Sequence, residues 1–335
     1  MGLEFKAPCK FTLSANEIRV FSECPRKRYY SSRDCLAIRS NTPRKALILG
    51  SAFHSALEYY YKTIDSILAE KFGGTDYKFD YDDVLEVYDS IEKFPLTKQE
   101  VDENGEVVLD ENGEAKMVPI VMEADYKTLV NMLNCYIPQL LTDLVDYEII
   151  ACESNFNIEN WPIDDVMYHG LIDMIVRRRY DDKYYYFEHK TCTNFRPEIY
   201  SRFDIQLHLY AIQGYKEYGE LFGGIILNQV KKAKTDKGYD QQRDLYTYTG
   251  EEMHDFTNWL KAKTQALVSP NNVHAPCNNY MSCKMCEYID VCMKYGYQVP
   301  KTHEEITESV SFTNDEGKAL FAYDPRDSKD EGDGE

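Results

Sequence analysis

The sequence predicts a mixed α/β fold in which helices flank a central sheet of mixed strand direction. Apolar and aromatic runs of strand length recur between residues 148 and 249, and segments with apolar residues at helical spacing lie on both sides of them. A chain of 335 residues can also bury a sizeable core. We therefore expect a single domain over residues 1–300, with a helical part at 14–145, the core sheet at about 147–250 and an acidic tail at 301–335.

The charge distribution argues against a protein that adheres non-specifically to polyanions. The formal net charge is −19, and residues 301–335 hold four basic and eleven acidic side chains, which leaves −12 for the rest. A chain with this balance that acts on DNA must concentrate its basic residues locally. Beyond Pro300 the composition is acidic and poor in apolar residues, so we expect disorder from about Asn314.

Two absent patterns bear on the class of protein. The sequence contains no run of eighteen apolar residues and no signal-peptide pattern, so we expect a soluble, cytoplasmic protein that does not enter a membrane. It also contains no Walker loop of the form GxxxxGK followed by Ser or Thr, which argues against a built-in ATP motor.

The N-terminal part reads as helical. Ser14–Glu17 has the spacing of a capping box and begins a short helix through Phe21. Leu47–Lys62 is an amphipathic helix in which His54 and Glu58 lie four residues apart on one face. A lone histidine in a helix is more often a packed core residue than a metal ligand, so both interpretations of His54 stay open at this point.

The middle of the chain carries less chemical information. Residues 64–96 have a helical pattern, and residues 124–145 predict a scaffold helix. Between them, 102–106 and 110–114 form a near-repeat built around Asn-Gly, the strongest turn signal. The segment 100–119 is therefore either a small β-hairpin or a mobile acidic insertion.

The core strands follow in order. Glu148–Phe156 reads as a strand, and the runs Gly170–Val176 and Tyr184–Phe187 flank a charged turn, which indicates a β-hairpin. The remaining elements are a helix that contains Gln206 and Tyr210, strands at Gly223–Val230 and Asp244–Thr249, and a helix at Glu251–Ala266.

The hairpin places chemistry-bearing residues together. Asp173 lies in an apolar run, where a carboxylate is costly unless something binds it. Residues i and i+2 of a strand share a face, so Glu188 and Lys190 point one way and His189 the other. In the simplest register Asp173 reaches the face of Glu188 and Lys190. Two carboxylates and a lysine at the end of a sheet make an oxygen-rich site for a hard cation.

Such a site suits phosphodiester cleavage, because a divalent cation lowers the pKa of a water molecule and stabilises charge on the attacked phosphate. Lys190 is then placed to orient the water or to stabilise developing negative charge. The alternative is a salt bridge on a solvated strand. The order of Gly-x-x-Asp, Glu-x-Lys and a helix with Gln206 and Tyr210 on one face favours the metal site.

These motifs resemble the core of the PD-(D/E)XK nuclease superfamily, in particular its RecB-like exonuclease branch. Gly170-Leu-Ile-Asp173 is similar to the metal-binding aspartate motif, Glu188-His-Lys190 to the (D/E)xK motif, and Gln206-x-x-x-Tyr210 to the helix motif that follows. Gly50–Glu58 resembles the first motif of the family, in which a histidine ligates the metal.

The resemblance implies a restriction-endonuclease-like core and a role for each matching residue. His54, Asp173 and Glu188 would bind Mg²⁺ or Mn²⁺, with the backbone carbonyl of His189 as a further ligand. Lys190 would assist the attacking water, and Gln206 and Tyr210 would position the DNA strand. Glu58 and Glu153, which lies where the family often has an acidic residue, are secondary candidates.

A lysine-rich loop follows the strand at 223–230. It contains Lys231, Lys232, Lys234 and Lys237, and in so acidic a protein it is a candidate contact to the DNA backbone. A solvated hairpin tip is the equal alternative. The same two interpretations apply to the basic runs 177–179 and 26–28.

The chain has ten cysteines, and without a secretion signal metal binding is more plausible than a disulfide framework. Cys283, Cys286 and Cys292 are spaced C-x2-C-x5-C, and one distant thiolate would complete four ligands. Cys24, which precedes a proline and a basic run, is a candidate for that ligand.

These four cysteines resemble those of the iron–sulfur members of the RecB-like group, the AddB-type helicase-nucleases and the CRISPR-associated exonucleases. The resemblance implies that Cys24 joins the segment 277–292 through a 4Fe–4S cluster. Four cysteines also suit structural zinc, and iron–sulfur is the favoured interpretation. Cys277 is a possible substitute for one ligand.

The favoured function is thus a divalent-metal-dependent DNA exonuclease with a structural 4Fe–4S cluster. It would act on DNA ends or single strands in recombination, repair or replication, with a helicase or recombination protein as a partner in trans. The alternatives are a non-catalytic DNA-binding accessory protein on a nuclease fold and a zinc-stapled interaction protein.

Overall fold

A computed structural model describes most of the chain, and its elements fall into two units. The described residues are 9–32, 35–40, 45–73, 79–100, 107–110, 113–233, 238–269, 276–277, 279–307, 309, 312–313 and 318–323. Unit 1 comprises Met1–Pro43, Asn157–Gly170 and Gly250–Glu335, and unit 2 comprises Arg44–Phe156 and Leu171–Thr249. Each is described separately.

Unit 2 contains the candidate site residues His54, Asp173, Glu188 and Lys190. Its helices are α3 (Lys45–Phe72), α4 (Tyr81–Ser90), α5 (Glu123–Asp146), α6 (Glu198–Arg202) and α7 (Ile205–Tyr218), followed by the 3-10 turn Gly219–Leu221. Its strands are β3 (Thr97–Gln99), β4 (Met117–Pro119), β5 (Tyr147–Glu159), β6 (Val166–Arg178), β7 (Tyr184–Cys192), β8 (Phe222–Lys231) and β9 (Gln241–Tyr246), of which β5 and β6 continue into residues of unit 1.

The sheet of unit 2 has mixed strand direction, as the sequence predicts. Strand β6 pairs antiparallel with β7 and also pairs with β5. Strand β7 runs parallel to β8, and β8 runs antiparallel to β9. The predicted hairpin is confirmed, with Met174 opposite Phe187 and Arg177 opposite Tyr184. In this register Asp173, next to Met174, and Glu188, next to Phe187, lie on neighbouring paired strands.

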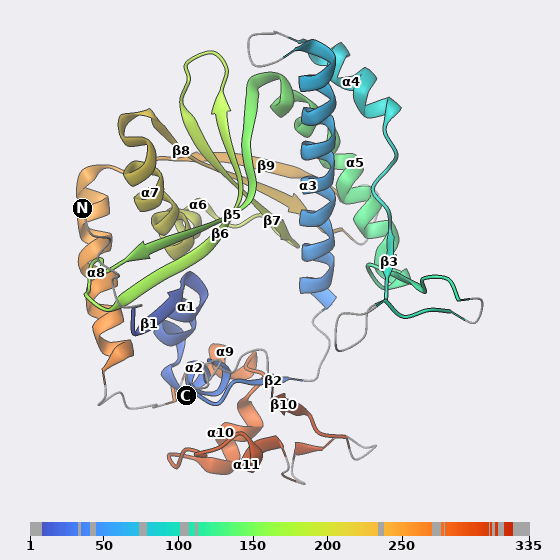
Figure 1. Cartoon of the computed structure of the whole chain (residues 1–335). Helices are drawn as coiled ribbons and strands as arrows, with labels where there is room; N and C mark the ends of the chain where they lie inside the picture. The colour runs from blue at the N-terminus through green and yellow to red at the C-terminus, as the bar shows by residue number, and fades with distance from the viewer. Residues whose placement is uncertain are drawn as a thin grey trace, which may run out of the picture. The chain divides into compact units, whose positions relative to one another are not determined.

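Helices cover both faces of this sheet. Phe53 of α3, Tyr136 of α5 and Phe187 of β7 belong to one buried apolar core. On the other face the ring of Tyr186 lies 6.2 Å from that of Tyr210 in α7. Alternate residues of β7 therefore face opposite layers, and Figure 1 shows α3 and α5 on one side of the strands and α7 on the other. The predicted mixed α/β fold is confirmed.

Helix α3 joins two segments that the sequence predicts separately. The amphipathic helix expected at Leu47–Lys62 continues without a break into the helical pattern expected from residue 64, and it ends at Phe72. Tyr60, Ile64 and Leu68 are all buried and repeat every four residues, so one apolar stripe carries the helix onward. The predicted hairpin alternative for 100–119 also holds in part, because β3 and β4 pair antiparallel. Residues 101–106 and 111–112 lie outside the described part of the chain.

Unit 1 contains β1 (Phe11–Ser14), α1 (Ala15–Glu23), α2 (Pro25–Ser31) and α8 (Gly250–Val268). Ser14 caps α1 in the predicted capping box with Glu17. Strand β1 was not predicted; Phe11 pairs with Val166, so β1 runs parallel to the first residues of β6. The hydroxyl of Tyr168, also at that end of β6, lies 2.7 Å from the hydroxyl of Thr264 in α8.

The cysteine-bearing part of unit 1 has its own small core. It comprises β2 (Ile38–Ser40), α9 (Tyr280–Lys284), α10 (Ile289–Tyr295), α11 (Glu304–Thr307) and β10 (Phe321–Tyr323), and β10 pairs antiparallel with β2. The buried residues of this core are Tyr30, Leu36, Ile38, Tyr288, Val291, Ile306, Phe312 and Phe321. The hydroxyl of Tyr288 donates to the carbonyl of Ile38 at 2.8 Å.

This core includes Phe321, which lies beyond Asn314, where the sequence predicts that disorder begins. Ile306, Phe312 and Phe321 are buried although the surrounding composition is acidic. Three well-separated apolar side chains suffice to anchor the segment, and average composition does not register them. Residues 314–317 and 324–335 lie outside the described part. None of the helices in the described residues is both long and apolar enough to span a membrane.

Candidate active site

Three predicted or secondary candidates converge in unit 2. His54 of α3, Glu153 of β5 and Asp173 of β6 each offer one ligand atom, and these atoms lie within 4.8 Å of one another. Among the residues that the structure describes, they form the one group of at least three such side chains. The cavity between them has a volume of about 10 Å³, which is the space of about one water-sized sphere. A single cation fits that volume and that set of donors.

Asp173 is held at the centre of this group. One carboxylate oxygen accepts a hydrogen bond from the backbone N–H of His189 at 2.6 Å, and the other lies 3.4 Å from Nδ1 of His54. Burial alone would raise the pKa of Asp173, but the contact with His54 and the nearby histidine charges lower it. Asp173 therefore stays ionised at neutral pH.

His54 responds to the same contact in the opposite sense. Burial would lower the pKa of His54, but the hydrogen bond and the charge of Asp173, together with the charge of Glu188, raise it. The imidazole and the carboxylate thus stabilise each other's charged forms. A cation that binds here competes with the proton on His54.

Glu153 reaches the site through an irregularity of its strand. Its φ is 51°, in the left-handed region that residues with a side chain rarely adopt. Neighbouring side chains of a regular strand face opposite sides, yet Cys152 and Glu153 both line the cavity beside His54. The left-handed residue breaks the alternation and turns the carboxylate inward. Sequence reasoning ranks Glu153 second because periodicity does not reveal such a break.

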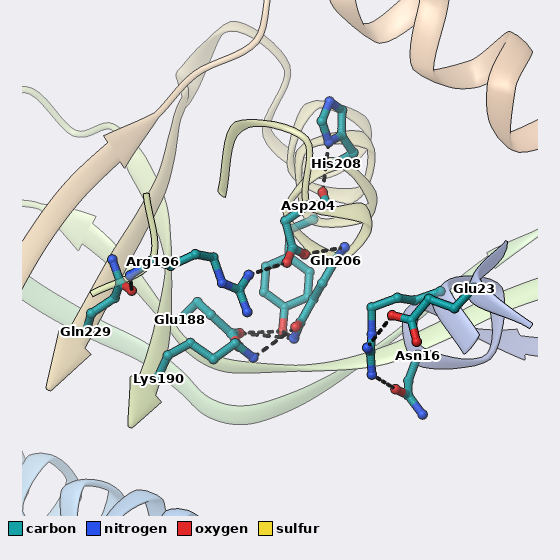
Figure 2. A network of polar contacts seen from close by, with 11 residues as sticks. Asn16, Glu23, Glu188, Lys190, Arg196, Asp204, Gln206, His208 and Gln229 are labelled. Atoms are coloured by element: carbon teal, nitrogen blue, oxygen red, sulfur yellow. Dashed lines mark hydrogen bonds and ion pairs between the residues drawn. The ribbon is translucent and has the colours of Figure 1, made fainter. Parts of the chain in front are cut away.

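Glu188 lies on the adjacent strand in a second polar cluster (Figure 2). Its carboxylate forms an ion pair with Lys190 and accepts hydrogen bonds from Gln206 at 3.2 Å and from the Tyr210 hydroxyl at 2.8 Å. Gln206 also accepts from Nζ of Lys190 at 3.0 Å, and the Tyr210 hydroxyl contacts the carbonyl of Leu171. The structure brings all four predicted residues of this face together.

The electrostatic state of Glu188 differs from that of Asp173. Glu188 is 1 % exposed. Burial, and then the charge of Asp173, raise the pKa of Glu188 to about 7, although Lys190 and Tyr210 oppose that shift. A carboxyl group with a pKa near neutrality can hold or release a proton at working pH.

The predicted ligand set is thus divided between the two clusters. His54 and Asp173 meet as expected, whereas the carboxylate of Glu188 is bonded to Lys190, Gln206 and Tyr210 and lies outside the group within 4.8 Å. Glu153 takes the third place. Glu58 lines the cavity but pairs with Lys62.

His189 points away from Glu188 and Lys190, as the strand period predicts. Its ring centroid lies 6.2 Å from that of Tyr61, 5.6 Å from that of Tyr136 and 6.2 Å from that of Phe187. Burial lowers the pKa of His189 to about 3, so the imidazole is neutral. The backbone carbonyl of His189 as a metal ligand stays a prediction.

The basic residues named from the sequence have varied surroundings. Nζ of Lys231 lies 4.2 Å from the ring centroid of Phe195 and 3.8 Å from Asp240. The backbone N–H of Lys232 donates to Cys192 at 2.7 Å. Lys234 and Lys237 lie outside the described residues. Arg177 and Arg178 form ion pairs with Glu148 and Asp181 respectively.

The cysteine-bearing part of unit 1 contains a separate cavity of about 410 Å³. Its lining includes Cys24, Cys277, Cys283, Cys286 and Cys292. The sulfurs of Cys277 and Cys283 are 3.7 Å apart. No three of the described thiol sulfurs lie within 4.8 Å of one another, whereas four sulfurs around one zinc ion would be about 3.8 Å apart, given Zn–S bonds of about 2.3 Å.

A family model described as the PD-(D/E)XK nuclease superfamily matches residues 12–293. No curated protein matches the chain. A solved structure titled "Crystal structure of SSO0001" is 13 % identical and covers 86 % of this chain and 88 % of that chain, with a TM-score of 0.35.

Proposed function

Because the chain belongs to the PD-(D/E)XK nuclease superfamily, we propose that it is a divalent-metal-dependent DNA exonuclease with a structural 4Fe–4S cluster. The observation that carries the catalytic part is the meeting of His54, Glu153 and Asp173 around a cavity for one ion. The adjoining cluster of Glu188, Lys190, Gln206 and Tyr210 supports it.

Each residue of the two clusters has a proposed task. His54, Glu153 and Asp173 would hold Mg²⁺ or Mn²⁺, and Glu188 would complete the set from the next strand. A divalent cation bound there would lower the pKa of a water molecule and offset the charge on the attacked phosphate. Oxygen ligands favour these hard cations, and the imidazole of His54 favours Mn²⁺ over Mg²⁺.

Lys190 is the proposed electrophilic and water-orienting group. Its ammonium is fixed between the carboxylate of Glu188 and the side-chain oxygen of Gln206. Burial would lower the pKa of Lys190, but the charge of Glu188 and the hydrogen bond to it raise that pKa. A fixed positive charge can stabilise the negative charge that develops on a phosphate under attack.

We propose that the substrate is DNA, which the protein would cleave from an end or as a single strand. The three motifs that resemble the RecB-like branch support exonuclease action, and the same resemblance supports a place in recombination, repair or replication beside a helicase or recombination partner in trans. Within this proposal Gln206 and Tyr210 hold Glu188 and Lys190 in position relative to the DNA strand.

For the cysteine cavity we propose a 4Fe–4S cluster held by Cys24, Cys283, Cys286 and Cys292. The four cysteines line one cavity of about 410 Å³, and their resemblance to the iron–sulfur members of the RecB-like group supports a cluster over a single zinc ion. Such a cluster would link α2 to α9 and α10 within unit 1. Iron and acid-labile sulfide content after anaerobic purification tests this; stoichiometric zinc without iron would replace the cluster with a zinc staple.

The catalytic proposal is tested with 5′- and 3′-labelled oligonucleotides in Mg²⁺ or Mn²⁺. We expect progressive shortening by the wild type, and cleavage at least about 100-fold slower with Lys190→Ala or Asp173→Ala. Lys183→Ala, at the exposed β6–β7 turn, is the matched control and should cleave normally. Circular dichroism checks that each variant is folded. DNA binding without cleavage by the wild type would instead identify an accessory protein.

A further inference from the structure

A cluster of large apolar side chains is exposed beside the catalytic motifs. Ile199, Tyr200 and Phe203, from α6 and its C-terminal cap, have exposed fractions of 63 %, 68 % and 72 %. We call these three residues the α6 patch. Scattered exposed apolar residues need no explanation, but three within five positions of one short segment mark an interaction site.

The segment that carries the α6 patch is fixed at both ends (Figure 2). The backbone N–H of Arg196 donates to the side-chain oxygen of Gln229 in β8 at 2.9 Å. The guanidinium of Arg196 donates to Asp204 at 2.6 Å, and Asp204 in turn accepts from the backbone N–H of Gln206 at 2.8 Å. Ser201, between Tyr200 and Phe203, is fully buried. The exposed rings are therefore presented by a rigid segment, which lowers the entropy cost of binding.

The α6 patch is continuous with the candidate active site. Asp204 directly follows Phe203 and caps α7, and Gln206 in the first turn of that helix contacts both Glu188 and Lys190. Phe203 therefore lies three positions before a residue of the cluster that would act on a phosphodiester.

Cationic side chains lie near the same segment. Lys231 lies over the ring of Phe195, and the guanidinium carbon of Arg202 lies 5.2 Å from the ring centroid of Tyr248. Exposed aromatic faces combined with basic side chains are the means by which proteins bind single-stranded nucleic acid, because each base offers a face for stacking and each phosphate a charge. In a duplex those base faces are covered by neighbouring bases.

We propose that Tyr200 and Phe203 form a base-stacking platform for single-stranded DNA that leads to the active site. The proposal deepens the proposed nuclease function and rests on it for the fate of the strand, whereas base-dependent binding can be measured without cleavage. Ile199 would extend the apolar surface of the platform.

The test compares two oligonucleotides of equal length, oligo-dT and an abasic strand with the same phosphates. Fluorescence anisotropy in Ca²⁺, without Mg²⁺ or Mn²⁺, reports binding. For the variant Tyr200→Ala/Phe203→Ala we expect binding to oligo-dT that is about tenfold or more weaker, and unchanged binding to the abasic strand. Tyr200→Trp/Phe203→Trp should restore binding to oligo-dT, because indole rings also stack.

Tyr180→Ala is the matched control. Tyr180 is 76 % exposed and lies at the β6–β7 turn, at the other end of β7 from the α6 patch, so its removal should leave both affinities unchanged. Equal loss on both strands, or no loss on either, would overturn the platform. So would a wild-type dimer that light scattering shows to dissociate in the double alanine variant, because the patch would then bind a second copy.

The same data separate this proposal from the nuclease proposal. Base-dependent binding by a wild type that cleaves nothing in Mg²⁺ or Mn²⁺ would refute the nuclease and keep the platform. Cleavage of labelled DNA by a protein whose affinity ignores the bases would keep the nuclease and refute the platform.

Discussion

Asp173 and Glu188 are neighbouring carboxylic acids whose pKa values are shifted in opposite directions. The contact with His54 outweighs burial at Asp173, whereas burial outweighs the contacts with Lys190 and Tyr210 at Glu188, whose pKa is raised to about 7. Pairs of acids whose surroundings separate their pKa values are typical of catalytic sites. The proton on Glu188 should therefore govern how activity depends on pH.

The variant Tyr210→Phe tests this control. The Tyr210 hydroxyl donates to Glu188, and that hydrogen bond lowers the pKa of Glu188, so its removal should raise that pKa. We expect about tenfold slower cleavage at pH 7 and an acidic limb of the pH–rate profile that moves to higher pH. Tyr215→Phe, on the same helix but bonded to the carbonyl of Tyr248, is the control. An identical shift in both variants would contradict the assignment.

His189 should make stability depend on pH. Its pKa is about 3 in the fold, against 6.5 for the ordinary group. As pH falls below 6.5 the unfolded state takes up a proton that the folded state refuses, so stability is lost on acidification. Between pH 7 and pH 5 this amounts to roughly 2 kcal/mol.

Urea unfolding with EDTA at both pH values measures this effect. His189→Leu should reduce the loss on acidification, and His254→Leu, at an exposed position, should not. An unchanged pH dependence in His189→Leu would show that the His189 ring does not stay neutral in the fold.

Several neighbour relations between residues followed from spacing alone. The strand period separates His189 from Glu188 and Lys190, and the helix period puts Gln206 beside Tyr210, so these neighbours are predictable. Glu153 was predictable only as a secondary candidate, because its orientation depends on a left-handed backbone that no sequence period encodes.

The irregularity in β5 can be tested as an element. Glu153→Gly removes the cost of the left-handed backbone. Its free energy of unfolding, measured in urea, should therefore exceed that of Glu153→Gln by about 1 kcal/mol. Both variants lose the carboxylate and should bind Mn²⁺ about tenfold more weakly by calorimetry. If the glycine variant is no more stable than the glutamine variant, the backbone at this position is not strained.

A buried ion pair joins α5 to β9. The guanidinium of Arg243 contacts Asp143 at 2.5 and 2.7 Å, and Asp143 also accepts from the Tyr61 hydroxyl at 2.7 Å. Arg243→Leu would leave a buried carboxylate without its cation and should cost about 3–5 kcal/mol of unfolding free energy. The double variant Asp143→Leu/Arg243→Leu should recover a large part of that loss in urea. A double variant as unstable as the single one would mean that hydrogen bonding, not charge, dominates.

Element existence was more predictable than element limits. The helices at 124–145 and 251–266 match the observed α5 and α8 closely, whereas the hairpin strands expected at 170–176 and 184–187 are longer as β6 and β7. Strand β1 was missed because it has four residues, merges with a capping box and pairs with a partner more than 150 positions away. Sequence patterns report local periods, and such a strand is defined by its partner.

At the scale of the whole molecule, the mixed α/β fold was predicted correctly, and the strand β10 beyond Asn314 was not. Average composition correctly indicated an acidic region poor in apolar residues, but it overlooked the three apolar residues that are buried there, Ile306, Phe312 and Phe321. Their burial beside Tyr288 depends on residues from the opposite end of the sequence.

The cysteines give the prediction for this scale. Cys24→Ser and Cys292→Ser should lose the iron content of the anaerobically purified protein and expose the segments around 24–40 and 280–323 to proteolysis. Cys277→Ser, whose sulfur lies 3.7 Å from that of Cys283, should retain both iron and protection. If Cys277→Ser loses as much iron as Cys24→Ser, Cys277 is a ligand and the proposed set of four is incorrect.

The small core around Tyr288 also determines when part of the chain can fold during its synthesis. The partner of Ile38 follows 250 positions later in the chain. A ribosome that adds about 5–20 residues per second therefore needs about 10–50 seconds to reach that partner after it has added Ile38. During that interval Tyr30, Leu36 and Ile38 are uncovered apolar surface on a nascent polypeptide. Burial of this surface must therefore await synthesis of the C-terminal residues that pack on it, Tyr288, Val291, Ile306, Phe312 and Phe321.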